Sequence, residues 1–112
     1  MPDSRERAHY VIGVDVGTTA AKVVAFEYSW DANPDARRRA PHTAVHEYPL
    51  SRPRAGWRVQ DAEVVVAATL RSLADCVAQL DGGSVVALSV STAMHGLIAL
   101  DDDARPLTPI IT

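Results

Sequence analysis

A short turn between two apolar segments constrains the fold of this 112-residue chain more than any other feature. Residues 9–16 (HYVIGVDV) and 21–28 (AKVVAFEY) are rich in β-branched side chains, which is typical of buried strands. The turn between them contains Gly17, Thr18 and Thr19. Because so short a connection cannot cross over a sheet, we expect the two strands to form an antiparallel hairpin.

The following residues predict a third strand between two loops. Residues 43–50 (TAVHEYPL) are the strand candidate, and Pro49 indicates its end or a sheet edge. Loops are expected at residues 29–41 and 51–60. The basic run at residues 37–39 (RRR) is interpreted as a solvated face of the first loop.

One helix is expected after Asp61, which fits an N-cap, with Glu63 in the first turn, where the helix dipole favours a negative charge. Gly82 and Gly83 are expected to end it. Cys76 is interpreted as a core residue. The predicted core-facing stripe of this helix consists of Val66, Leu70, Leu73, Val77 and Leu80.

The C-terminal third predicts more strands. Residues 84–92 (SVVALSVST) are the most strand-like segment, and we expect a central, buried strand there. A short strand at residues 97–100, a turn at 101–106 and the start of another strand at 107–112 follow. The order β-β-β-α-β, with a return strand beside the first in a mixed sheet, predicts the opening of a ribonuclease-H-like α/β domain. Because no helix covers the last apolar run, we expect the domain to be incomplete.

Composition excludes several classes of protein. The length allows at most one domain, and a single cysteine, Cys76, excludes an internal disulfide and fits a reducing compartment. No apolar run reaches the roughly 18 residues of a membrane span, and the first ten residues lack the apolar part of a secretory signal. The net charge of −3 does not indicate the basic surface that nucleic-acid binding needs. We expect a cytoplasmic protein with residues 1–8 disordered.

Asp15, Gly17, Thr18, Thr19 and Lys22 form a group of residues suited to phosphate chemistry. An acidic residue at a strand end can hold hydrated Mg²⁺, and a glycine lets the backbone come close to a ligand. The threonine hydroxyls and turn amides can donate to phosphate oxygens, and the lysine supplies positive charge. Phosphoryl transfer needs this set, although an ordinary hairpin turn can have the same spacing.

Two segments carry a family resemblance. The hairpin IGVDVGTTAAKVVAF resembles the first phosphate-binding hairpin of the actin, heat-shock-70 and sugar-kinase superfamily. Met94, His95 and Gly96 resemble the segment that borders the sugar pocket in the FGGY carbohydrate kinases. Residues 56–61 (GWRVQD) resemble that family's Gly-Trp-x-Glu-Gln-Asp entry to its first helix, with Val59 in place of the usual glutamate.

The resemblance implies ATP and Mg²⁺ as cofactors. Asp15 would place the metal, and the phosphates would be bordered by Gly17, Thr18, Thr19 and Lys22. Residues 9–112 would then be a partial N-terminal domain that ends before the family's Trp-x-Asp-x-Arg segment. The catalytic base and the second domain are expected downstream, so no residue of this chain is expected to be the base.

The resemblance also implies a sugar or sugar acid as substrate, bordered by Met94, His95 and Gly96. The segment MHGLIALDDDARPLTPIIT most resembles gluconate kinases, which make 6-phosphogluconate, with xylulose kinases as near neighbours. Expected partners are the missing C-terminal part of the enzyme or a second copy of the chain. Two alternatives are a non-catalytic split module that needs a complementary chain, and an actin-like or chaperone-like ATPase, against which the Met-His pair argues.

Overall fold

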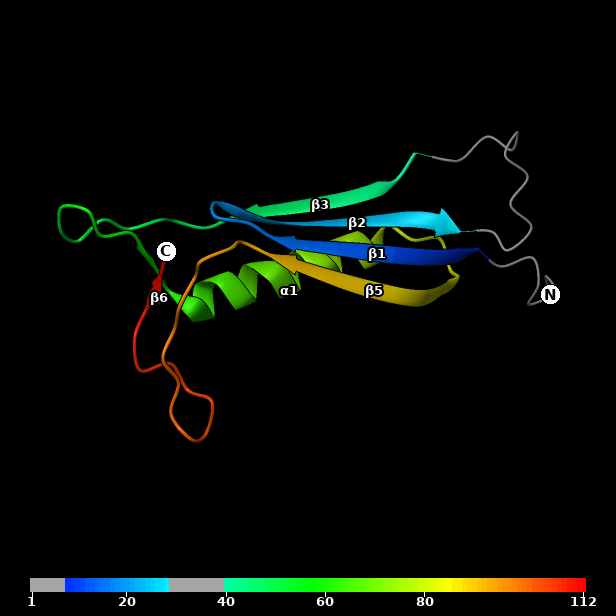
Figure 1. The fold of residues 1–112 in the computed structure, drawn as a ribbon. Helices are drawn as coiled ribbons and strands as arrows, with labels where there is room; N and C mark the ends of the chain where they lie inside the picture. Colours follow the sequence, from blue (N-terminus) through cyan, green and yellow to red (C-terminus); the bar gives the residue numbers. More distant parts are fainter. Residues whose placement is uncertain (1–7, 29–39) are drawn as a thin grey trace.

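The computed structural model describes residues 8–28 and 40–112, so the predictions for residues 1–7 and 29–39 lie outside the described residues. It confirms the expected order of the main elements, and the strand expected to start within residues 107–112 is present as a short strand, while one further short strand at residues 59–60 was not expected (Figure 1). The elements are β1 (His9–Val16), β2 (Ala20–Tyr28), β3 (His42–Glu47), β4 (Val59–Gln60), α1 (Ala62–Ala78), β5 (Ser84–Thr92) and β6 (Ile110–Ile111).

The main sheet has four strands in the order β3-β2-β1-β5. The predicted hairpin is confirmed, because β1 and β2 are antiparallel over their whole length. β3 pairs with the other edge of β2 and is also antiparallel to it. β5 returns beside β1 in parallel, as expected for a strand that follows a crossover helix. Figure 1 shows α1 lying against one face of this mixed sheet.

The prediction of β5 as a central, buried strand is wrong for the part of the chain that the structure describes. β5 lies at the edge of the sheet, where it pairs with β1 alone, and all nine of its residues are exposed. A β-branched apolar run has the same pattern whether one or two strands flank it, so the sequence alone could not place this strand within the sheet.

Helix α1 begins as predicted but buries a different face. The Asp61 side chain accepts hydrogen bonds from the Glu63 and Val64 amides at 2.9 and 3.4 Å, which confirms the N-cap. The predicted stripe is wrong in part, since the side chains of Val66 and Leu70 are 56% and 59% exposed and that of Val77 is exposed as well. The residues of α1 that are buried are Val65, Ala68, Ser72 and Cys76.

Small side chains explain this choice of face. The small side chains of Ala68, Ser72 and Cys76 let α1 pack closely against β2 and β3. Larger side chains on this face would hold the helix further from the sheet. The Ser72 hydroxyl is satisfied, because it donates to the carbonyl oxygens of Ala21 and Ala68 at 3.2 and 2.9 Å. Burying a polar group costs little free energy when its hydrogen bonds are made. A prediction from hydropathy alone therefore selects the wrong face of the helix.

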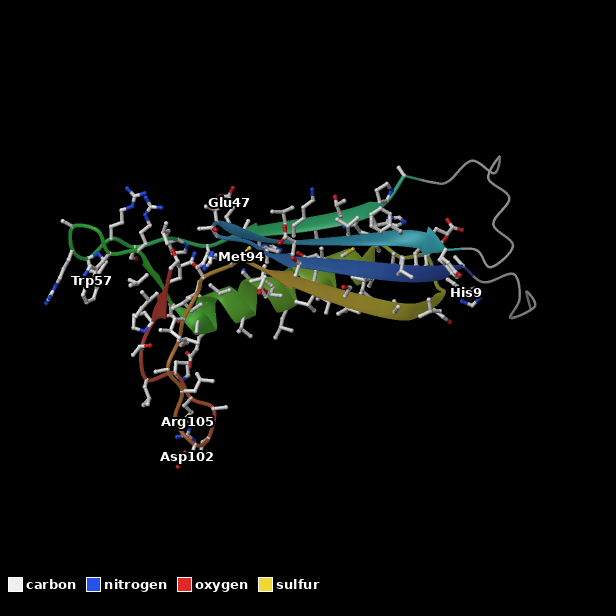
Figure 2. All side chains as sticks on the ribbon, viewed as in Figure 1. His9, Glu47, Trp57, Met94, Asp102 and Arg105 are labelled. Carbon is white, nitrogen blue, oxygen red and sulfur yellow. The ribbon has the colours of Figure 1, made fainter. Side chains whose placement is uncertain are left out.

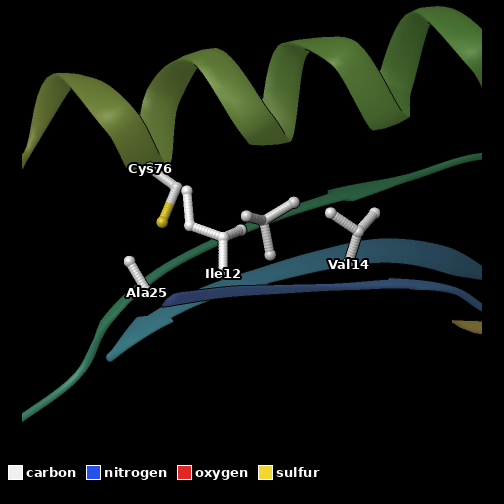
Figure 3. Close-up of a cluster of buried hydrophobic side chains, with 5 residues drawn as sticks. Ile12, Val14, Ala25 and Cys76 are labelled. Atoms are coloured by element: carbon white, nitrogen blue, oxygen red, sulfur yellow. The ribbon is translucent and has the colours of Figure 1, made fainter. Parts of the chain in front are cut away.

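One core cluster lies between the hairpin and the C-terminal half of α1. Cys76 packs there with Ile12, Val14, Val23 and Ala25 (Figure 3). The interpretation of Cys76 as a core residue is therefore confirmed. Burial raises the pKa of its thiol, which keeps it protonated and inert at neutral pH.

The C-terminal residues contribute one strand to a small second sheet. β6 pairs with β4, and Leu97 bridges to Ile111 through backbone hydrogen bonds of 2.9 and 2.8 Å. The predicted strand at residues 97–100 is wrong, because only isolated bridges form there, whereas the turn at 101–106 is present. The predicted loop at 51–60 likewise ends in β4. None of the described helices is long and apolar enough to cross a bilayer.

The exposed side of α1 leads to a stability prediction. Val66 and Leu70 lie on its solvent side, and β5 also exposes Leu88 and Val90. Exposed apolar groups of this kind promote association. We expect Leu70→Gln to reduce self-association of the chain, measured by sedimentation, while changing the free energy of unfolding by only about 0.5 kcal/mol.

Ala68→Glu is the matched control for that variant. Ala68 lies on the buried face of the same helix, so a carboxylate there has no solvent and no partner. We expect the free energy of unfolding to fall by about 4 kcal/mol or more. Equal effects of the two substitutions would contradict the assignment of the faces.

Candidate functional site

The turn between β1 and β2 is tight because position 17 is glycine. The Gly17 amide donates to the Ala20 carbonyl oxygen at 2.9 Å, and a Cβ at position 17 would lie 3.1 Å from that same oxygen. Thr18 and Thr19, at the tip, expose their side chains. The turn therefore presents backbone and hydroxyl groups at one end of the sheet.

Two buried polar residues hold this turn from inside. The Tyr48 hydroxyl donates to the Gly17 carbonyl oxygen at 2.5 Å, and the Gln60 Nε2 donates to that of Thr18 at 2.5 Å. The Tyr48 amide donates to the carbonyl oxygen of Thr19 at 3.0 Å. Tyr48 and Gln60 are only 5% and 6% exposed. The carbonyl groups of three consecutive turn residues are thus each fixed by the chain that links β3 to α1.

Asp15 and Lys22 face each other across the hairpin. They are directly opposed in the β1–β2 register, so their side chains share one face of the sheet. It is the face away from α1, because the neighbouring Val14 and Val23 point into the core beneath the helix. Ser91 of β5 lies beside Asp15 on that face. A negative and a positive group are therefore close to the turn but outside the core.

The segment after β5 runs alongside the turn. The Ala93 amide donates to the Val16 carbonyl oxygen at 2.9 Å, which joins the ends of β5 and β1. His95 then adopts a left-handed backbone conformation with φ of 65°, which turns the chain away from the sheet. Met94 is 79% exposed (Figure 2). The predicted residues Met94, His95 and Gly96 therefore begin beside the start of the turn between β1 and β2.

A cavity of about 310 Å³ joins the two groups of predicted residues. Gly17 and Thr18 line it from the turn, and Met94 and Gly96 line it from the segment after β5. Of the other predicted residues, Asp15, Thr19, Lys22 and His95 are not part of its lining. Gln60 also lines the cavity, although the sequence analysis did not select it. Most of the remaining wall is apolar, and two threonines also belong to it. These lining residues are Val16, Val65, Ala93, Leu97, Ile98 and Ile110, with Thr92 and Thr112.

The donor set fits a single-carboxylate magnesium site. Within residues 8–28 and 40–112, no group of three or more His, Cys, Asp or Glu side chains could enclose a metal ion. Asp15 is one exposed carboxylate at a strand end, beside the turn. Mg²⁺ commonly takes one or two protein carboxylates together with phosphate oxygens and water, so Asp15 fits a metal that arrives with a phosphate ligand.

The environment of Tyr48 predicts a pH dependence. Burial raises the pKa of its hydroxyl above the ordinary value of 10.0, and the negative charge of Asp15 raises it further. The unfolded chain then loses this proton before the folded protein does, so the stability contribution is complete below pH 10 and lost above it. We expect the free energy of unfolding, measured in urea, to fall as the pH rises above about 10.

Tyr48→Phe provides the control for this prediction. The variant lacks the ionisable hydroxyl, and losing the bond to Gly17 should lower stability at neutral pH by about 1 kcal/mol. The difference between the variant and the original chain should shrink as the pH rises above 10. Parallel curves for the two proteins would show that Tyr48 does not titrate in this way.

The sequence of this chain is similar to those of known proteins. The N-terminal domain of the FGGY family of carbohydrate kinases matches residues 10–112. The gluconokinase of Bacillus subtilis (strain 168) is 32% identical over 103 residues, which cover 92% of this chain and 18% of that protein. The xylulose kinase of Staphylococcus xylosus is 30% identical over 102 residues, 91% of this chain and 20% of that protein. The chain therefore spans about a fifth of the length of these relatives.

Solved structures of sugar kinases have a similar fold over the same part of the chain. The gluconate kinase from Lactobacillus acidophilus has a TM-score of 0.78 at 32% identity, over 94% of this chain and 20% of that one. The xylulose kinase from the same organism has a TM-score of 0.76 at 35% identity, over 93% and 19%. The predicted fold, the N-terminal part of a sugar kinase of the actin and heat-shock-70 superfamily, is confirmed. With its match over residues 10–112, this chain belongs to the FGGY family of carbohydrate kinases.

Proposed function

We propose that this chain is the N-terminal part of an ATP-dependent kinase that phosphorylates a sugar acid, with gluconate as the first candidate. The observation that carries the proposal is the cavity of about 310 Å³ shared by the turn and the segment after β5. Phosphoryl transfer needs the phosphate donor and the acceptor hydroxyl next to each other. One cavity bordered by Gly17 and Thr18 on one side and Met94 and Gly96 on the other provides that proximity.

The turn and its neighbours would bind the phosphates. Thr18 and Thr19 offer amides and hydroxyls at the exposed tip, and Lys22 offers a positive charge on β2. In the reaction, the γ-phosphoryl group passes from ATP to the sugar oxygen, ADP leaves, and the proton of the sugar hydroxyl passes to a base. We propose that the base lies in the part of the enzyme beyond residue 112.

Asp15 would hold the Mg²⁺ that accompanies ATP. Such an ion supplies positive charge that stabilises the phosphoryl group during transfer. The contribution of this chain is one carboxylate fixed at the end of β1, with the turn that follows it restrained by two hydrogen-bonding side chains.

Met94, His95 and Gly96 would border the sugar. His95 is exposed beside the cavity, and its ring can donate to or accept from sugar hydroxyls. Xylulose is the second candidate substrate, because the xylulose kinase of Lactobacillus acidophilus is 35% identical and its gluconate kinase is 32% identical to this chain.

Chimeric enzymes test the proposal. Residues 10–112 would replace the matching segment in the Bacillus subtilis gluconokinase and in the Staphylococcus xylosus xylulose kinase. We expect ADP release with gluconate from the first chimera, and a larger retained fraction of activity than in the second chimera with xylulose. The reverse order would favour xylulose, and two chimeras as inactive as their Asp15→Asn forms would contradict the function.

The 112-residue chain by itself is expected to be inactive with ATP, Mg²⁺ and gluconate. It spans about a fifth of its relatives, and transfer depends on groups that surround the phosphoryl from several sides. The measurement is coupled ADP release, with the parent gluconokinase as positive control. Turnover that survives Asp15→Asn would contradict both this prediction and the site.

A further inference from the structure

The phosphate turn of the proposed kinase is held by two side chains that the proposed function does not use. We propose that Tyr48 and Gln60 are positioning residues, which orient the peptide groups of the turn so that their amides face the phosphates of ATP. The inference rests on the proposed function, and it begins from the hydrogen bonds to the carbonyl oxygens of Gly17 and Thr18.

Peptide geometry connects these bonds to phosphate binding. In a trans peptide the N–H points away from the C=O of the same group. The carbonyl of Gly17 shares its peptide group with the amide of Thr18, and the carbonyl of Thr18 shares its group with the amide of Thr19. Tyr48 and Gln60 draw both carbonyls inward, so both amides are turned outward. Neither amide donates to any residue that the structure describes, which leaves both available to an anion.

Both side chains are anchored firmly enough to do this. Tyr48 packs in a buried cluster with Ala21, Val65 and Ala68, which joins β2 to α1. Gln60 lies in β4, directly before the N-cap Asp61 of α1. Burial keeps the Tyr48 hydroxyl protonated at neutral pH, since its pKa is raised, so it remains a donor. The turn is therefore pre-organised before the ligand arrives, which lowers the entropic cost of binding.

Tyr48→Phe and Gln60→Met remove the donors with little change of volume or charge. Each has a matched control in the same molecule. Tyr10→Phe removes the hydroxyl of another buried tyrosine, on β1. Gln79→Met removes a bond of the same type at an exposed position, in which Nε2 donates to the Thr43 carbonyl oxygen at 2.7 Å, far along the chain from the turn. The controls report what such losses cost in stability alone.

Steady-state kinetics of the active gluconokinase chimera test the proposal. Each of the two turn variants is expected to raise the KM for ATP roughly fivefold to twentyfold, as the loss of one positioning bond would. The KM for gluconate should change less than twofold, as should both constants in Tyr10→Phe and Gln79→Met. In the double variant Tyr48→Phe/Gln60→Met, the increase in the KM for ATP should be smaller than the product of the two single increases, because both bonds restrain one turn.

Amide hydrogen exchange in the 112-residue chain separates this inference from the proposed function. The Gly17 and Tyr48 amides are bonded to the carbonyl oxygens of Ala20 and Thr19, so their exchange reports how firmly the turn is closed. Exchange of the two is expected to rise roughly fivefold in Gln60→Met and to stay unchanged in Gln79→Met.

The outcomes are distinct. If neither the exchange rates nor the KM for ATP respond to Tyr48→Phe and Gln60→Met, the positioning role is overturned. Exchange that is already as fast in the original chain as in an unfolded peptide would overturn it as well. If exchange responds as expected but the chimera has no kinase activity, the two residues hold the turn and the proposed function fails instead.

Discussion

Asp15→Asn in the active kinase is expected to lower kcat about a hundredfold to a thousandfold. The substitution keeps the shape of the side chain at the end of β1 and removes the charge that would hold Mg²⁺ near the transferring phosphoryl group. Because this interaction strengthens as charge develops in the transition state, kcat should fall while the KM for the sugar stays nearly constant.

The measurement is ADP release over a range of Mg²⁺ concentrations. The variant should need more Mg²⁺ to reach half of its maximal rate, which a defect in folding would not produce. Asp75→Asn is the control, since Asp75 is an exposed carboxylate on α1 that is bonded to His46 at 2.6 Å, and its kinetics should match those of the original enzyme. A normal kcat in Asp15→Asn would remove Asp15 from the site.

His95→Ala is expected to raise the KM for the sugar roughly threefold to a hundredfold and to leave the KM for ATP almost unchanged. In the proposed function, the bond from His95 to a sugar hydroxyl would be present before and during transfer and would stabilise both states. Its loss would then cost about 0.5–1.5 kcal/mol, or about 3 kcal/mol if a charge is involved. Initial rates with each substrate varied in turn give the two constants.

The backbone at His95 calls for a second variant. Its φ of 65° lies in the left-handed region, which histidine and asparagine occupy more readily than alanine does, and asparagine also keeps a polar side chain. His95→Asn should therefore recover part of the sugar affinity with no cost to stability. A raised KM for ATP with an unchanged KM for the sugar would show that the segment after β5 does not border the sugar.

Local signals in the sequence predicted the elements well. The Gly17 turn, the strands beside it and the Asp61 cap each depend on residues next to one another, and each is present in the structure. The buried face of α1 was predicted less well, because large apolar residues lie on several sides of the helix. The structure buries small residues against the sheet and leaves Leu70 exposed, a choice that depends on how closely two surfaces approach.

The candidate site was predicted in its parts but not in its assembly. The residues of the turn could be selected from their chemistry, and those of the segment after β5 from their family resemblance. The parallel pairing of β1 with β5 then brings Gly17, Thr18, Met94 and Gly96 to one cavity. Tyr48 and Gln60 could not be selected. Their bonds join residues 31 and 42 positions apart, and a contact between a side chain and a distant carbonyl leaves no periodic pattern.

The parallel pairing of β1 with β5 also sets the order in which this domain can fold. His9 pairs with Tyr28 in the hairpin but with Ser84 in the parallel ladder, so the hairpin closes a short loop and the ladder a long one. Closing the longer loop costs more chain entropy and is slower. During synthesis, the hairpin and its turn can form while the rest of the chain is still being made. The cavity forms later than the hairpin, because its lining includes Ile110 and Thr112, which are made after β5.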